Sequence, residues 1–189
     1  MRVLALDIEG FRGIRKARIV FSQHAALVGP NGSGKSTILD ALSLTFGRTQ
    51  LVRELTEHDF FGSTPAEVTR FRLVATVGGF STEEPDDHHE WFRDGRGVPK
   101  WWNARTNTVE PQQSADAATL CVQIGLAARF DHEDLKVEQL RYFHDDDDAV
   151  DPVDADAVNK FPNRLLNEIG FFVLPVRRTS EATLCFASE

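Results

Sequence analysis

The chain has 189 residues, a hydrophobic fraction of 41%, a charged fraction of 26% and a formal net charge of −8, which are ordinary values for a globular domain. They exclude a disordered chain, a collagen-like repeat and a disulfide-rich scaffold, and no stretch approaches the ~20 apolar residues of a membrane span. We therefore expect one cytoplasmic domain, or two small ones, with no membrane partner and with Cys121 and Cys185 in a reducing compartment.

The first part of the chain predicts a strand hairpin, then a strand, a glycine loop and a helix. Strands are predicted over 3–14, which turns at its glycines, and over 17–21. A third apolar run, 25–28, enters the glycine loop. From Lys35 onward the apolar residues recur at helical spacing as far as Phe46, and Gly47 is placed to end the helix.

The second part predicts mainly strands with one buried face. Alternating apolar residues indicate strands over 70–77, 120–130 and 137–143. Residues 81–116 have no clear period, which favours a long insertion rather than core structure. The three tryptophans of this segment, with basic residues between them, suit base stacking or a partner groove, although a small satellite core explains them more simply. A helix over 162–169, ended by Gly170, and a buried strand over 171–176 follow, and residues 179–189 begin another element.

Positive charge is concentrated near the N-terminus. Residues 1–56 carry eight Lys and Arg against four Asp and Glu, so the rest of the chain is strongly acidic. A net acidic chain attracts nucleic acid poorly, and any contact with DNA would have to be local. The basic segment is the candidate for such a contact, although a solvated strand face explains it more simply.

The residues that carry the chemistry lie in the glycine loop. Gly29 to Ser36 match the phosphate-binding pattern GxxxxGK[ST], between a predicted strand and a predicted helix. In such a loop, backbone N–H groups and the helix N-terminus bind the phosphates, Lys35 reaches the β- and γ-phosphates, and Ser36 offers its hydroxyl to Mg²⁺. We therefore expect a site for ATP and Mg²⁺, with Lys35 as the catalytic residue and Ser36 as the metal ligand. The expected site residues are Gly29, Pro30, Asn31, Gly32, Ser33, Gly34, Lys35, Ser36 and Thr37.

A plain glycine turn before a helix is the alternative explanation of this motif. It leaves Lys35 in the first helical turn, where a positive charge opposes the helix dipole and gains nothing without a bound anion. The nucleotide site is therefore the better explanation.

Two longer segments resemble a known group of proteins. Residues 6–14, which end in Phe-Arg-Gly-Ile, and residues 27–37 resemble the N-terminal ATPase lobe of the RecF/SMC group of ABC-type ATPases. Residues 55–61 and 171–179 are similar to segments of the OLD (overcoming lysogenization defect) family, which are ATPases fused to a Toprim nuclease. The resemblance implies an α/β fold, a P-loop ABC-type ATPase lobe with an antiparallel β subdomain. Residues 1–189 would form the N-terminal portion of that domain, with 81–116 as an insertion.

The resemblance also implies additional site residues and partners. Arg12 and Gly13 would lie near the nucleotide, with Asp59 and residues 177–179 as lesser candidates. The magnesium-contacting glutamine of the group has no counterpart near Val176. The Walker B strand and the LSGG signature are also absent from this chain, so we expect it to bind ATP with little turnover. A full-length protein would hydrolyse ATP between two protomers and couple this to DNA processing, in genome repair or defence against phage.

Other functions and sites are supported less well. A nucleotide-gated interaction module, in which ATP orders an interface and hydrolysis is slow, remains open. A small P-loop kinase is a third hypothesis, and it is disfavoured because a kinase gives the predicted antiparallel strands no role. The acidic tract 145–156 lacks the glycine and glutamate of a calcium loop, and the adjacent His88 and His89 point to opposite faces if extended, so exposed loops explain both.

Overall fold

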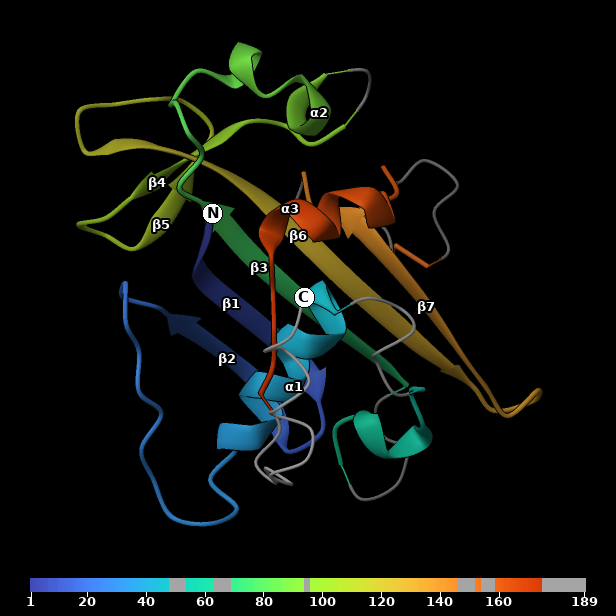
Figure 1. Cartoon of the computed structure of the whole chain (residues 1–189). Coiled ribbons are helices and arrows are strands. Elements are labelled where there is room, and N and C mark those ends of the chain that lie inside the picture. The colour runs from blue at the N-terminus through green and yellow to red at the C-terminus, as the bar shows by residue number, and fades with distance from the viewer. Residues whose placement is uncertain (48–53, 63–68, 94–95, 146–151, 154–158, 175–189) are drawn as a thin grey trace, which may run out of the picture.

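The structure, a computed structural model, describes residues 1–47, 54–62, 69–93, 96–145, 152–153 and 159–174 (Figure 1). Seven strands form one sheet in the order β2-β1-β3-β6-β4-β5, and β7 pairs with β6 as well. The strands are β1 (Arg2–Phe11), β2 (Ile14–Val20), β3 (Arg70–Gly78), β4 (Lys100–Asn103), β5 (Thr108–Glu110), β6 (Ala117–Asp131) and β7 (Lys136–Phe143).

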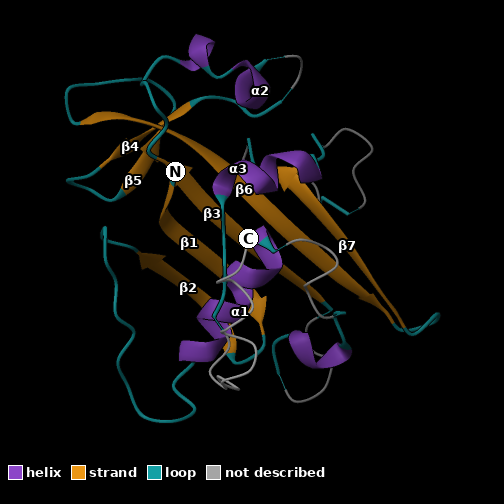
Figure 2. Ribbon diagram, viewed as in Figure 1, coloured by secondary structure: helices purple, strands orange, loops and turns teal. Residues whose placement is uncertain are grey.

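Few helices accompany this sheet, and α1 and α3 lie across one of its faces (Figure 2). The helices are α1 (Lys35–Phe46), α2 (His89–Phe92) and α3 (Leu166–Ile169), with single 3₁₀ turns η1 (Glu57–Asp59), η2 (Pro85–Asp87) and η3 (Asn163–Leu165). No helix of the described part of the chain is long and apolar enough to cross a membrane.

The predicted strands and the main helix are confirmed where the alternation of apolar residues was clear. The hairpin of β1 and β2, the long strands β3, β6 and β7, and α1 all occur at the expected places, and Gly47 ends α1. The helix expected over 162–169 is a 3₁₀ turn followed by one turn of α-helix, and Gly170 ends it in the left-handed conformation. Local periodicity therefore determined these elements.

The core lies between α1 and the face of the sheet that carries the alternating apolar residues. Leu6, Leu73 and Ile124 are fully buried on neighbouring strands, and Ala41 and Phe46 of α1 pack into the same cluster. Burying a side chain of this kind contributes roughly 1.5–3 kcal/mol. The sheet therefore fixes α1, and with it the loop that precedes the helix.

The C-terminal end of α1 is also held by a guanidinium from the far edge of the sheet. Arg141 of β7 donates to the carbonyl oxygens of Leu44 at 2.8 Å and of Gly47 at 3.2 Å. These carbonyls belong to the helix end that has no intrahelical donors, and a positive charge there complements the helix dipole. Burial lowers the pKa of Arg141, yet the arginine remains charged at neutral pH.

We expect Arg141→Met to lower the free energy of unfolding by about 2 kcal/mol, because it removes a charged donor from buried carbonyls while keeping the length of the side chain. Urea denaturation followed by circular dichroism measures the change. The matched control is Arg129→Met, because Arg129 forms an ion pair with Glu138 of the neighbouring strand β7 at 2.6 Å. Equal losses in the two variants would contradict a specific role of Arg141.

Two predicted strands are wrong in the described structure. Residues 25–28 form no strand, and the Val28 side chain is 93% exposed. Residues 171–174 are also irregular, with Phe172 80% exposed and Leu174 77% exposed, and residues 175–176 lie outside the described residues. Both runs are apolar, but a strand exists only when a neighbouring strand pairs with it, and no described strand is adjacent to either run.

The expectation that residues 81–116 lie outside the core is also wrong. Trp91 on α2 is 2% exposed and belongs to the main core cluster, and its indole N–H donates to Glu168 at 2.7 Å. Trp102 on β4 is 5% exposed and packs with Leu4 and Cys121 in a second cluster. The segment carries β4 and β5, which extend the sheet beyond β6. Its lack of period reflects short elements with at most two buried residues each.

Cys121 lies in the second cluster, where burial raises the pKa of its thiol to about 12. Because the thiolate is the reactive form, we expect Cys121 to resist iodoacetamide at about pH 8 in the native protein and to react once urea unfolds it. Peptide mass spectrometry measures both. The neutral thiol contributes its full stability below the ordinary pKa of 9.0, and that contribution is lost as the pH rises toward 12. Rapid native labelling would contradict the burial of this side chain.

All strand pairs of the described residues are antiparallel. The parallel sheet expected for an α/β ATPase is therefore not formed within the described part of the chain, and the α/β fold class stays a prediction.

Candidate nucleotide-binding site

The glycine loop leads directly into α1 at the solvent-exposed side of the helix. Gly32 and Gly34 have φ angles of +80° and +89°, a conformation that favours glycine over residues with a Cβ. Gly34 is the N-cap of α1, and the N–H of Ile38 donates to its carbonyl at 3.0 Å. The glycines of the motif therefore occur where the backbone turns most sharply.

The N-terminus of α1 has the properties of an anion site. No side chain caps it, and its first turn contains no acidic residue. The first N–H groups of any helix have no intrahelical partner, so the N–H groups of Lys35, Ser36 and Thr37 point out of the helix toward the loop. Together with the positive end of the helix dipole, they favour a negatively charged ligand.

The Lys35 ammonium lies against the loop rather than in solvent. Its Nζ donates to the carbonyl oxygens of Gly29 at 2.8 Å and Pro30 at 2.7 Å, and it lies 3.4 Å from Ser33 Oγ. The loop thus keeps a positive charge beside the free N–H groups of α1. Neutral carbonyl oxygens are weaker hydrogen-bond partners of an ammonium than phosphate oxygens are. A phosphate can therefore replace them as the partner of Lys35.

Ser36 is exposed in the first turn of α1, where its hydroxyl can reach a ligand bound at the helix end. No group of three or more His, Cys, Asp or Glu side chains suited to a metal occurs within the part of the chain that the structure describes. Magnesium often binds to one or two protein oxygens together with phosphates and water. Ser36 fits that mode, in which most ligands would come from the nucleotide.

The turn between β1 and β2 lies next to this helix. A Cβ added to Gly34 would lie 4.0 Å from Ile14 Cδ1, which places residues 11–14 beside the end of the glycine loop. Arg12 occupies that turn with φ +48°, and its guanidinium pairs with Asp40 of α1 and, at 3.0 Å, with Asp59. The predicted residues Arg12 and Asp59 are thus brought to α1 from distant parts of the sequence, whereas residues 177–179 lie outside the described residues.

Comparison with known proteins places the chain in a family. Residues 1–166 match the sequence model of a family described as a protein of unknown function, DUF2813. The chain belongs to the DUF2813 family. Over 48 residues it is also 40% identical to structural maintenance of chromosomes protein 1 of Schizosaccharomyces pombe and to that of Arabidopsis thaliana. Each match covers 24% of this chain and 4% of the relative, so the chain spans only a small share of those proteins. The resemblance to the SMC group is therefore found over a short segment, and the resemblance to the OLD family is not confirmed.

Two further residues of this DUF2813 protein support the site and were not found by sequence reasoning. Asp40 follows Ser36 by four positions and binds Arg12, and Arg141 holds the opposite end of α1. The sequence shows that Asp40 follows the motif by one helical turn. It does not show that Arg12 is the partner of Asp40, because Arg12 lies 28 positions away. Nothing local to Arg141 indicates a contact with α1.

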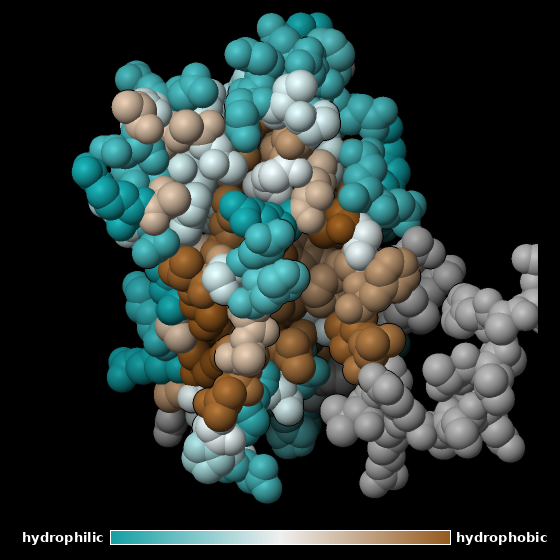
Figure 3. All heavy atoms as spheres, turned by 60° about the vertical axis from the view of Figure 1, so that its left-hand side comes forward, coloured by the Kyte–Doolittle hydropathy of each residue, from teal (hydrophilic) through white to brown (hydrophobic). Residues whose placement is uncertain are grey.

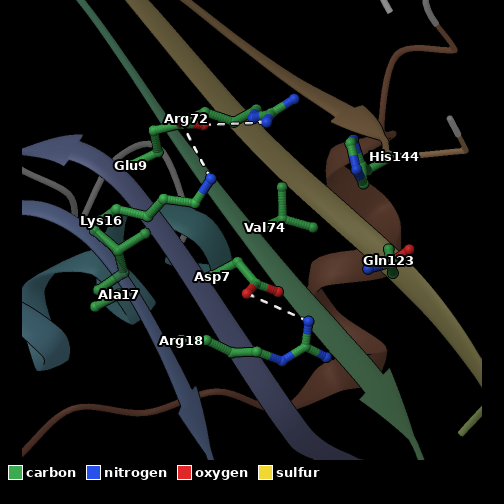
Figure 4. A pocket seen from close by; sticks show the side chains of 10 residues that line it. Asp7, Glu9, Lys16, Ala17, Arg18, Arg72, Val74, Gln123 and His144 are labelled. Carbon is green, nitrogen blue, oxygen red and sulfur yellow. Dashed lines mark hydrogen bonds and ion pairs between the residues drawn. The ribbon is translucent and has the colours of Figure 1, made fainter. Parts of the chain in front are cut away.

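The opposite face of the sheet bears a groove lined by charged side chains from β1, β2 and β3 (Figure 4). Asp7 pairs with Arg18 at 3.5 Å, and Glu9 pairs with Arg72 at 3.1 Å and with Lys16 at 3.9 Å. The carboxylates therefore compensate the positive charges of the basic N-terminal segment. This favours the solvated strand face over a surface that follows a phosphate backbone.

The other candidate ligands of the DUF2813 chain have ordinary surroundings. His88 contacts Thr82 and the Phe80 ring, and no metal cluster forms around it among the described residues. Asp145 accepts from the N–H of Val98 at 2.8 Å, and most of the acidic tract after it lies outside the described residues. Within the described residues neither feature indicates a metal site.

Proposed function

We propose that this DUF2813 protein is the ATP-binding lobe of an ABC-type ATPase related to the RecF and SMC proteins. The observation that carries the proposal is the position of Lys35, whose ammonium lies within a glycine loop at an uncapped helix N-terminus. A first helical turn that contains a lysine and no acidic residue is electrostatically unfavourable, because the lysine charge opposes the positive end of the helix dipole. A bound anion removes this cost. The short similarity to two proteins named for structural maintenance of chromosomes supports the same function.

Each residue of the motif has a chemical role in this proposal. The N–H groups at the start of α1 hold phosphate oxygens, and Lys35 compensates the charge of the β- and γ-phosphates. Ser36 gives its hydroxyl to Mg²⁺, which in turn supplies compensating charge when it is bound with ATP. The turn that carries Arg12 and Gly13 lies beside α1, where Arg12 pairs with Asp40 and supplies a second cation.

We also propose that the two exposed apolar runs, 25–28 and 171–174, which form no strand here, contact the remaining parts of the assembled ATPase. Figure 3 shows apolar surface gathered in the lower half of one side of the molecule, and the exposed apolar residues of the chain include Val28, Leu39, Phe172 and Leu174.

We further propose that the protein belongs with the OLD family, on the resemblance at residues 55–61 and 171–179. This assignment includes a Toprim nuclease, DNA as the substrate and a role in repair or phage defence. A second protomer that completes the ATP site belongs to the same proposal. Size-exclusion chromatography with light scattering, with and without Mg-ATP, tests the dimer. An unchanged monomer mass at saturating ATP would contradict it.

The decisive experiment is a calorimetric titration of the chain with Mg-ATP and with Mg-adenylyl imidodiphosphate. We expect one nucleotide to bind per chain. Ligand at about 100 times its dissociation constant should stabilise the fold by about 2.7 kcal/mol. For a chain of this length that shift raises the melting temperature by roughly 5–11 °C. No binding heat and no thermal shift at millimolar nucleotide would contradict the proposal.

The alternative function is a nucleotide-gated interaction module. It predicts the same binding but no turnover under any condition, whereas the ATPase predicts turnover once the remaining parts of the site are supplied. Phosphate release measured with the protein and its partner segments separates the two.

A further inference from the structure

The turn between β1 and β2 holds an arginine between two carboxylates that differ greatly in solvent exposure. The Arg12 guanidinium is 24% exposed, and it pairs through Nε with Asp59 and through Nη1 with Asp40. Asp59 is 1% exposed, whereas Asp40 is 45% exposed. The single positive charge of Arg12 thus faces two negative charges. One of the two carboxylates can therefore be exchanged for another anion without leaving the guanidinium unpaired.

The pair with Asp59 is built into the backbone. The N–H of Arg12 donates to the carbonyl of Asp59 at 2.9 Å, and the N–H of Phe61 donates to the carbonyl of Gly10 at 2.8 Å. Asp59 Oδ2 also accepts from the N–H of Thr56 at 3.0 Å. The segment with Asp59 and the turn with Arg12 are therefore joined through both backbone and side chain, and we expect this pair to persist when a ligand binds.

The pair with Asp40 has no such support. Asp40 lies in the middle of α1, half exposed, and pairs with Arg12 by its side chain alone. It follows Ser36 by four positions, so the two side chains lie on the same face of the helix, one turn of about 5.4 Å apart. The carboxylate that pairs with Arg12 thus belongs to a residue one helical turn from the hydroxyl proposed to bind Mg²⁺.

We propose that Asp40 is a positioning residue that holds the terminal nitrogens of Arg12 beside α1 while no ligand is bound, and that a nucleotide phosphate replaces Asp40 as the second anion of this arginine. This inference rests on the proposed function, because it concerns the same ATP site. Phosphate is a better bidentate partner of guanidinium than a half-exposed carboxylate. Asp59 keeps Nε and the backbone fixed, so the guanidinium stays in place and the phosphate oxygens take the position of the Asp40 carboxylate at Nη1.

Burial lowers the pKa of Arg12, but hydrogen bonds with Asp40 and Asp59 outweigh this and raise it above its ordinary value. The guanidinium is therefore charged both before and after the exchange. The released Asp40 carboxylate, being half exposed, can be hydrated by water without a large cost.

A double-mutant cycle with Asp40→Asn and Arg12→Gln tests this exchange, with the dissociation constant of Mg-ATP measured by calorimetry. We expect Asp40→Asn to tighten binding about threefold to fivefold, because the arginine no longer has to leave a competing anion. We expect Arg12→Gln to weaken binding, and Asp40→Asn to have no further effect in the Arg12→Gln background. Melting temperatures of all variants confirm that they fold.

The matched control is Glu9→Gln. Glu9 is 48% exposed and pairs with Arg72 at 3.1 Å on the opposite face of the sheet, so its loss should leave the dissociation constant unchanged. If Asp40→Asn weakens binding, or tightens it equally with and without Arg12, Asp40 acts through its own charge and the inference is overturned while the ATP site stands. If the unmodified chain binds no nucleotide, both the proposed function and this inference fail.

Discussion

Lys35→Ala is expected to weaken the binding of Mg-ATP about 100-fold, the largest effect on function of any single substitution in this chain. A hydrogen bond to a charged group contributes about 1.5–3 kcal/mol, and each 1.4 kcal/mol changes the dissociation constant tenfold. The Lys35 ammonium is held at the loop by the carbonyls of Gly29 and Pro30, so it is already close to where a phosphate would bind. Calorimetric titration of the purified variant with Mg-ATP measures the loss.

The stability of the Lys35→Ala variant should change by less than about 0.5 kcal/mol. Two hydrogen bonds with the loop are lost, but an unfavourable charge is also removed from the start of α1. The matched control is Lys16→Ala, because Lys16 is 81% exposed and lies on the opposite face of the sheet. If Lys35→Ala and Lys16→Ala bind Mg-ATP as tightly as the unmodified chain, the glycine loop is only a turn before a helix.

Asp59→Ala is expected to have the largest effect on stability among the site residues, a loss of about 3 kcal/mol. The substitution removes a buried carboxylate from Arg12 Nε at 3.0 Å and from the N–H of Thr56 at 3.0 Å. Arg12 is partly exposed and keeps Asp40, so the loss is smaller than for a fully buried pair. Thermal unfolding should show a melting temperature lower by roughly 6–12 °C.

The control for Asp59→Ala is Asp116→Ala. Asp116 also pairs with an arginine, Arg105 at 2.6 Å, but the two side chains are 49% and 75% exposed, and such surface pairs contribute little. The intermediate variant Asp59→Asn keeps the shape and one acceptor oxygen, and we expect its loss to lie between the two. An Asp59→Ala variant as stable as Asp116→Ala would show that η1 does not hold the turn at Arg12.

The fold and the site could be predicted from the sequence wherever the physical cause is local. The alternation of apolar residues in β3, β6 and β7 identifies strands because every second side chain faces the same side of a sheet. Gly34 and Lys35 indicate a glycine loop at the start of a helix because backbone conformation acts within a few residues, and phosphate binding there stays a prediction. None of this required knowledge of what packs against these segments.

The remaining features depend on which segments meet in three dimensions. Residues 25–28 and 171–174 are apolar enough for strands, but hydrogen-bonding partners decide whether a strand exists, and no described strand pairs with them. Trp91 is buried because α2 packs against Phe161 and Glu168, which lie about 70 residues later in the chain.

The arrangement around Arg12 depends on the tertiary structure in the same way. Its partners Asp40 and Asp59 are 28 and 47 positions away. By itself the sequence determined the glycine loop, the main helix and the long strands, because glycine conformation, helix periodicity and side-chain alternation are local properties. Only the tertiary structure decided which charges surround that helix, because ion pairs between distant segments form only after the sheet has brought those segments together.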